Sequence, residues 1–273
     1  MKKLTMTFGS VLALALVTQT HTVTANTSLP QAPKTPKGLA RCDNPITPAN
    51  RPVRKGEQLE YDVEMLGLPL GKANIVTWRR GEFEGEAVTE YRAWVEPDSL
   101  VSALAALEAQ AFSIVPDSSH TPVRSLTRYT FRGTEVKETQ ARSNDGRNLT
   151  STLNRNGKQK TKRRVFPEPA HDYLTSFLLL RRMPANTSGC TVIYGEQRAY
   201  TVWISAEGKD RIDTAQGERN LDRYHLRYAS DRGKKVREAD VWMTAGPDPI
   251  PVQARGPGRT APTVRLSGYR AGE

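Results

Sequence analysis

The stretch LEYDVEMLGLPLG, residues 59–71, carries the pattern that decides the fold. Apolar and acidic side chains alternate over residues 59–65, so the apolar ones share one face of an extended strand. Gly67 and Gly71 bound a short turn that leads into a second strand over about residues 71–79. This alternation is typical of an antiparallel sheet with one face on the core and the other in water.

The same alternation continues along most of the chain. Asp145-Gly146 and Asn156-Gly157 are strong signals for tight hairpins between such strands. Strands do not alternate with long helices, as they do in parallel sheets. The further predicted strands cover about residues 87–96, 123–132, 134–143, 147–154, 158–166, 190–194, 198–206, 209–214, 218–229, 234–244, 250–254 and 263–269.

Two segments have helical rather than alternating spacing. One helix is predicted over about residues 172–182, where Pro184 prevents much continuation, and a shorter one over about residues 99–107. We therefore expect a mainly β fold, an antiparallel meander that forms a strongly curved sheet or a partly open β-barrel with one or two short helices.

The first 25 residues have the order of features found in secretory signal peptides. Lys2 and Lys3 precede an apolar run over residues 4–17, and small residues end at Ala25. The run is shorter than the about 20 residues that a spanning helix needs, so an uncleaved anchor is the less favoured alternative. We predict an exported protein, periplasmic or outer-membrane-associated, cleaved near Ala25.

The rest of the chain is predicted to hold one domain. Residues 26–55 are rich in proline, threonine, lysine and asparagine, a composition that indicates a flexible arm. Residues 56–273 have a length within the range of single domains and are expected to form one β-rich unit.

Only two cysteines are present, Cys42 and Cys190. In an exported protein they are expected to form a disulfide, with two free thiols as the alternative. A lipid anchor on Cys42 is not expected, because Arg41 stands where a lipidation signal needs a small residue. Histidines are not spaced to complete a zinc site with the cysteines, so neither a metal nor another cofactor is predicted.

A series of short motifs runs from residue 56 to about residue 270: Gly56-Glu57-x-Leu59-x-Tyr61-x-Val63, Leu66-Gly67-x-x-x-Gly71-x-Ala73, Asp172-x-Leu174-x-Ser176 with Leu180-Arg181, Thr214-x-x-Gly217, Val241-Trp242, Asp248 and Pro251-Val252. In their order and spacing these motifs resemble an uncharacterised bacterial envelope family, domain of unknown function 3108. The resemblance implies a signal peptide and an antiparallel β fold, and it implies no established activity.

The balance of charge favours anionic partners. Removing residues 1–25 takes away Lys2 and Lys3 and no acidic residue, so the formal net charge of +11 becomes +9. Lipids, lipopolysaccharide and acidic glycans are the candidates that such an exported protein meets. Nucleic acid is not expected, because aromatic residues do not interleave with the basic ones as stacking platforms require.

The positive charge is most concentrated on one predicted strand. Lys158, Lys160, Lys162 and Arg164 alternate along it and so share a face. This basic ridge is the candidate ligand-binding site. The alternative interpretation is a solvated outer face whose cations protect an edge strand from pairing with other chains.

The sequence predicts no catalytic residue and no enzyme. The histidines fall in none of the usual metal-ligand patterns, and a Gly-x-Ser-x-Gly elbow is absent. Asp172 is explained as the cap of the predicted helix. The enzymatic alternative would pair Asp172 with Asp248 or Asp213, close to His171, in a hydrolase of envelope polymers.

The four tryptophans give the last indication. They lie in separate predicted strands and either pack in the core or line an apolar cavity suited to an acyl chain: Trp78, Trp94, Trp203 and Trp242. The leading hypothesis is a non-catalytic exported protein that binds a lipid, lipoprotein or other anionic envelope component and contacts the membrane peripherally. The alternative is a structural or assembly protein with an envelope protein partner.

Overall fold

One curled sheet makes up most of the molecule. In the computed structural model fifteen strands follow one another in the order β8-β7-β6-β5-β4-β3-β2-β1-β15-β14-β13-β12-β11-β10-β9. All neighbours are antiparallel except β9 and β10, which are parallel. The residues that the structure describes are 36–49, 53–99, 108–214, 217–233, 235–258 and 260–273.

The strand bounds follow the predicted pattern closely in most places. The strands are β1 (Gln58–Met65), β2 (Leu68–Phe83), β3 (Glu86–Pro97), β4 (Glu108–Pro116), β5 (Arg124–Phe131), β6 (Thr134–Arg142), β7 (Asn148–Arg155), β8 (Lys158–Val165), β9 (Ala170–His171), β10 (Gly189–Gly195), β11 (Arg198–Thr214), β12 (Gly217–Ser230), β13 (Arg237–Met243), β14 (Pro251–Arg255) and β15 (Thr263–Arg270).

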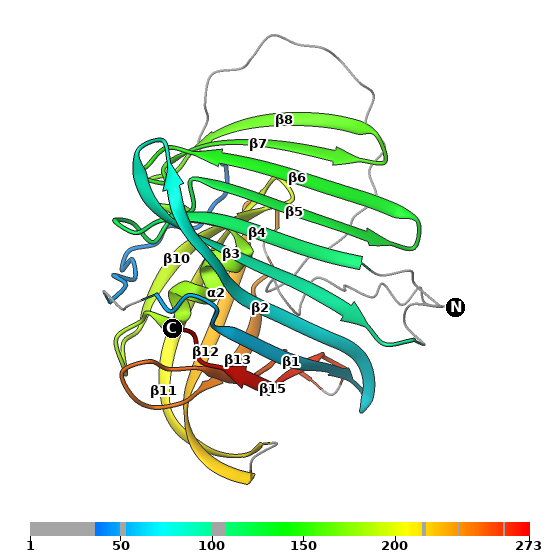
Figure 1. Cartoon of the computed structure of the whole chain (residues 1–273), viewed down its shortest axis with the longest axis vertical. Helices are drawn as coiled ribbons and strands as arrows, with labels where there is room; N and C mark the ends of the chain where they lie inside the picture. The colour runs from blue at the N-terminus through cyan, green and yellow to red at the C-terminus, as the bar shows by residue number, and fades with distance from the viewer. Residues whose placement is uncertain (1–35, 50–52, 100–107, 215–216, 234, 259) are drawn as a thin grey trace.

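The sheet bends round a single described helix, α2 (Tyr173–Arg181). Strands β2–β4 pass on one side of α2 and β10–β13 on the other (Figure 1). β1 pairs with β15, which joins the two ends of the chain within the sheet. Among the described residues β8 and β9, the ends of the strand order, do not pair with each other, so the curled sheet stays open. The predicted fold class is confirmed.

Helix α2 begins at a capping box. The Asp172 carboxylate accepts a hydrogen bond from the Thr175 N–H at 2.7 Å, and the Thr175 hydroxyl accepts one from the Asp172 N–H at 3.1 Å. The helix then sends apolar side chains to both walls of the curl. Leu174 packs with the β1–β3 core, and Leu180 packs with the core under β10–β13.

Some elements differ from the sequence-based expectation. The alternation does not predict β4, because its apolar residues change phase: Ala109 and Ala111 are followed by Phe112 and Ile114. The two strands predicted over 198–206 and 209–214 are one strand, β11, with an irregularity in its pairing between Ala206 and Gly208. The short helix predicted over 99–107 falls almost entirely outside the described residues.

The predicted disulfide between Cys42 and Cys190 is present, with the two Cα atoms 5.6 Å apart. It fastens residues 44–46 along β10. The N–H of Ile46 donates to the carbonyl of Cys190 at 2.9 Å, and the N–H of Cys190 donates to the carbonyl of Asn44 at 2.8 Å. The predicted division of the chain at residues 25 and 55 stays a prediction.

Gly71 shows why one glycine of the opening stretch is needed. Its φ is +138°, and a Cβ at this position would lie 2.3 Å from the carbonyl oxygen of Glu96 on β3. Any other residue would therefore push β2 and β3 apart.

Candidate functional site

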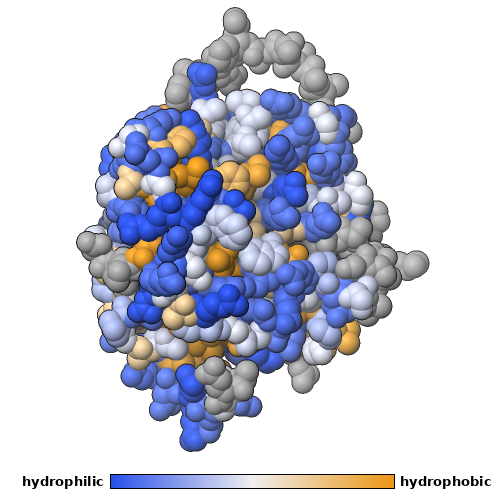
Figure 2. All heavy atoms as spheres, viewed as in Figure 1, coloured by the Kyte–Doolittle hydropathy of each residue, from blue (hydrophilic) through white to orange (hydrophobic). Residues whose placement is uncertain are grey.

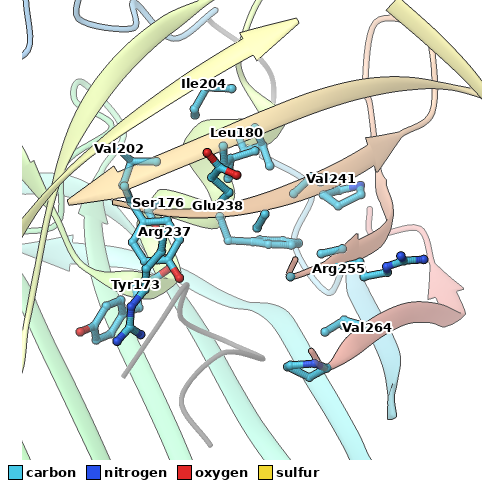
Figure 3. A pocket seen from close by; sticks show the side chains of 18 of the residues that line it. Tyr173, Ser176, Leu180, Val202, Ile204, Arg237, Glu238, Val241, Arg255 and Val264 are labelled. Carbon is cyan, nitrogen blue, oxygen red and sulfur yellow. The ribbon is translucent and has the colours of Figure 1, made fainter. Parts of the chain in front are cut away.

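A cavity of about 480 Å³ lies inside the curl, between α2, the strands from β10 to β15, and the neighbouring β1 and β2 (Figure 3). Pockets of about 300–1,000 Å³ commonly hold small-molecule ligands. The inner wall of the cavity consists of buried aliphatic side chains, among them Leu180, Ile193, Val202, Ile204, Leu226 and Val241.

Strand alternation places these side chains on one face. Ile204 of β11 lies opposite Leu226 of β12, and Leu226 lies opposite Ala239 of β13. All three line the cavity, so they form one row across three strands. From the other side α2 contributes Phe177 and Leu180. The result is an apolar chamber with one wall of sheet and one wall of helix.

The cavity opens between two connections of the sheet. Exposed Lys235 and Val236 line it from the β12–β13 connection, and exposed Arg255 lines it from the end of β14. Arg237 also lines this opening, with one carboxylate, Glu238. We call Lys235, Arg237 and Arg255 the mouth cations. Within the described part of the chain, no carboxylate lies within 4.0 Å of Lys235 or Arg255.

This arrangement suits an amphiphile better than an ion or a reaction. The wall is mainly aliphatic, with the hydroxyl groups of Tyr173, Ser176 and Thr191 as neutral polar groups, whereas the mouth offers three cations. Among the described residues, no cluster of three or more histidine, cysteine or acidic side chains could hold a metal ion. In the same part of the chain, no helix is long and apolar enough to cross a bilayer.

A buried ion cluster fixes the helical wall. Arg181, in the last turn of α2, donates to both carboxylate oxygens of Glu57 at 2.7 and 2.8 Å and to Asp248 at 3.1 Å. Burial alone would lower the pKa of Arg181, but the hydrogen bonds and charge of Glu57 raise it above its usual value. Glu57, Arg181 and Asp248 come from three separate motifs of the sequence, and the fold brings them together.

The same cluster argues against the carboxylate-pair hypothesis. Asp172 caps the N-terminus of α2, whereas Asp248 is bound at its C-terminal end. Nine helical residues span about 13 Å at 1.5 Å per residue, beyond the about 6.5–9.5 Å of an inverting carboxylate pair. Asp172 is also occupied by the hydroxyl of Ser113 at 2.7 Å. Asp172 and Asp248 are therefore held by separate partners, and the alternative pairing of Asp172 with Asp213, which is exposed on β11, stays a prediction.

The basic ridge lies on β8, an end strand of the sheet. Lys162 and Arg164 stand opposite Ser151 and Leu149 of β7, both of which are buried, so the ridge continues the inner face. Lys162 donates to the carbonyl of Gln197 at 3.2 Å. Lys158 and Lys160 are exposed. The ridge does not border the cavity, and ligand binding by it stays a prediction.

The tryptophans do not line the cavity, so that part of the expectation is wrong. Trp78 is 47% exposed beneath the guanidinium of Arg92, and the Trp242 N–H donates to Asp210 at 2.9 Å. The lining comes instead from valine, isoleucine, leucine and tyrosine. The alternation of the sequence indicates which residues of β11–β13 point inward. It does not indicate that the connections of these strands lie together at one opening.

Comparison with solved structures finds three similar chains. A β-barrel-like protein of domain of unknown function DUF1849 from Brucella abortus is 10% identical and covers 81% of this chain and 100% of its own, with a TM-score of 0.51. A candidate lipoprotein from Parabacteroides distasonis ATCC 8503 is 10% identical and covers 82% and 99%, with a TM-score of 0.33. A candidate exported protein with YmcC-like fold from Bacteroides fragilis NCTC 9343 is 8% identical and covers 83% and 99%, with a TM-score of 0.33.

At such low identity the first of these likenesses shows the fold alone, a β-barrel-like sheet. A comparison of the sequence with curated proteins gives no match. A family model matches residues 60–257, from the third residue of β1 to beyond β14. It indicates no catalytic activity. The chain therefore belongs to the family described as protein of unknown function DUF3108.

Proposed function

We propose that this protein is a non-catalytic exported protein that binds the acyl chain of an anionic amphiphile in the cavity under β10–β15. One observation carries the proposal: an aliphatic chamber of about 480 Å³ opens between cations. The chamber suits a hydrocarbon chain, and the opening suits the phosphate or carboxylate of its headgroup.

The energetics favour a chain over a compact polar ligand. Each methylene group removed from water contributes about 0.8 kcal/mol. A chain of about ten methylenes would gain about 8 kcal/mol before the loss of ligand freedom and chain ordering is subtracted. Burial of the chain can therefore supply most of the binding free energy.

The mouth cations add selectivity for charge. Arg237 and Arg255 are carried by β13 and β14, and Lys235 lies on the connection that leads to β13. Because they flank an opening with an apolar interior, a headgroup can contact them while its chain stays inside. The carboxylate of Glu238 at the same opening is paired with Arg227 at 3.9 Å, so the three mouth cations set the charge that a headgroup meets.

A competition experiment tests the cavity directly. Protein purified without detergent is titrated with a fluorescent fatty acid, and saturated fatty acids of increasing length displace it. Ala254→Phe fills the space between Val241 and Val264, its neighbours across β13 and β15. We expect this variant to lose probe binding by at least about tenfold, because one aromatic ring replaces part of the ligand's contact area.

Matched variants separate the cavity from unspecific effects. Ala87→Phe places the same ring on an exposed position of β3 and should bind the probe normally. Arg255→Glu should weaken binding, whereas Arg219→Glu, near the far end of β12, should not. Unchanged binding in Ala254→Phe, or no dependence on chain length, would overturn the proposal.

A further inference from the structure

The β1–β2 turn presents two leucines to solvent. Leu66 and Leu68 are 63% and 60% exposed, the two largest exposures among the large apolar side chains described. Leu66 and Gly67 form the two-residue turn itself, with φ values of 56° and 77°. These values belong to a tight hairpin of the type that favours asparagine, aspartate or glycine.

Among the described hairpins with this type of turn, only the β1–β2 turn has a leucine as its first residue. Three other turns have the same backbone, with a residue of positive φ followed by glycine, and their first residues are Glu84, Arg132 and Asn156. A bulky apolar residue rarely adopts a positive φ. Leu66 therefore gains neither burial nor a favourable backbone within this chain, which points to a contact outside it.

The leucine turn lies at the same end of the sheet as the cavity opening. Glu64, two residues before Leu66, pairs with Thr263, and Thr263 pairs with Arg255. Two strand spacings of about 4.8 Å separate β1 from β14. Figure 1 shows the β1–β2 turn at lower right, beside the start of β15.

Carboxylates near the turn are balanced in part by cations, because Lys72 is paired with Glu60 at 2.6 Å and also lies near Asp62 and Glu96. The carboxylate of Glu64 is paired with Arg265 at 2.6 Å, and the mouth cations follow on the next strands. Figure 2 shows a face that is otherwise largely hydrophilic, with apolar residues in small separate patches. Exposed leucines beside cations match the two layers of an anionic bilayer surface, hydrocarbon below and phosphate above.

We infer that this end of the molecule docks on an anionic lipid bilayer. Leu66 and Leu68 enter the boundary between headgroups and acyl chains, and Lys235 and Arg255 lie against phosphates. The cavity opening then faces the membrane, so an acyl chain can pass between bilayer and cavity without crossing water. This inference rests on the proposed function, because it names the source of the cavity's ligand.

Vesicle co-sedimentation tests the docking separately from cavity binding. The full chain without its first 25 residues is mixed with vesicles of phosphatidylglycerol and phosphatidylethanolamine, or of phosphatidylcholine alone. We expect binding to the anionic vesicles, weaker binding at high salt, and little binding to phosphatidylcholine. Leu66→Asn should weaken vesicle binding by at least about tenfold, as expected for a leucine that is buried on docking.

Two further readouts exclude a merely structural role. Leu66→Asn should raise the thermal midpoint or leave it unchanged, because asparagine tolerates the positive φ better. Glu84→Asn makes the matching change in the β2–β3 turn at the opposite end of the sheet and should bind vesicles normally.

The outcomes distinguish the docking inference from the proposed function. Normal vesicle binding by Leu66→Asn, or no binding of the wild-type chain to anionic vesicles, overturns the docking inference. Loss of vesicle binding in Ala254→Phe overturns it too, because the vesicles would then be held through the cavity alone. In each case the binding of the soluble fatty acid remains a separate test of the cavity.

Discussion

The inner face of the sheet is filled in two different ways. Under β4–β8 the buried side chains are largely polar: Ser113, Ser125, Glu138, Gln140, Arg142 and Ser151. Under β10–β15 they are aliphatic and aromatic and leave the cavity open. The polar half joins most of its polar groups by hydrogen bonds, with the Nε of Arg142 left without a partner, whereas the apolar half encloses empty space. The first half can hold the curl in shape while the second accepts a ligand.

Glu138 is the centre of the polar half. Its carboxylate accepts hydrogen bonds from Ser151 at 2.5 Å and from the backbone N–H groups of Glu196 and Gln197 at 2.6 and 3.0 Å. Glu196 and Gln197 form the β10–β11 turn, and both have positive φ. Because this turn belongs to the opposite wall, Glu138 connects β6 with β10 and β11 across the curl.

Glu138→Leu should have the largest effect on stability. The change leaves the N–H groups of Glu196 and Gln197 without an acceptor and removes one of the two carboxylates, with Asp172, whose charges offset that of buried Arg142. We expect a loss of about 3–5 kcal/mol in the free energy of unfolding, as for other broken buried ionic groups. Denaturant titration followed by tryptophan fluorescence measures it.

Two control variants are compared with Glu138→Leu. Glu135→Leu removes an exposed carboxylate from the same strand and should change stability by less than about 0.5 kcal/mol. Ala254→Phe adds bulk to the open half and should cost less than about 1 kcal/mol, because the cavity has room for the ring. A similar loss in Glu138→Leu and Ala254→Phe would contradict the contrast between the two halves.

The second largest expected effect is a loss of stability in acid, caused by His171. Burial first, and then the charges of Arg142 and His120, lower the pKa of His171 to about 4, despite the opposing effect of Asp172. Between pH 6.5 and about 4 the unfolded chain therefore binds a proton that the native protein does not. Stability is lost as the pH falls through this window, by up to about 3 kcal/mol.

The comparison of stability at pH 7 and pH 4.5 checks this effect. His171→Gln should lose less stability between the two pH values than the wild-type chain does, whatever its stability at pH 7. His225→Gln, at a partly exposed site beside Asp240, serves as the control. An equal acid loss in wild type and His171→Gln would show that His171 is not the group responsible.

Local rules predicted the elements, but long-range contacts decide what the two halves contain. Alternation predicted β1, the Asn156-Gly157 hairpin is present, and Asp172 caps α2 as expected. The pairing of β1 with β15 joins residues about 200 positions apart, and no local pattern encodes it. Likewise, Glu138 looks like an exposed residue in a polar strand, because its partners at 196 and 197 are distant in sequence.

The cavity shows the same limit. Valines and isoleucines at inward positions of β11–β13 predict a core, and only the path of the sheet leaves space between them and α2. The cations at its mouth come from the β12–β13 connection and from the ends of β13 and β14, which carry no special motif. The basic ridge, by contrast, was visible in the sequence because its four members share one strand, although its surroundings were not.

The smallest expected effect on stability comes from the titration of Lys162 in that ridge. Burial first, and then the cations Arg232, Lys160 and Arg164, lower the pKa of Lys162 to about 7. Between pH 7 and about 10.5 the unfolded chain keeps a proton that the native protein releases, so stability should rise with pH there. Because Lys162 is only half-buried, we expect about 1 kcal/mol or less. Denaturant titrations at pH 7 and pH 9.5 should show this rise in stability in the wild-type chain and in the exposed-site control Lys158→Met, but not in Lys162→Met. A rise that survives in Lys162→Met would place the titrating group elsewhere. The ridge would then be a plain solvated edge.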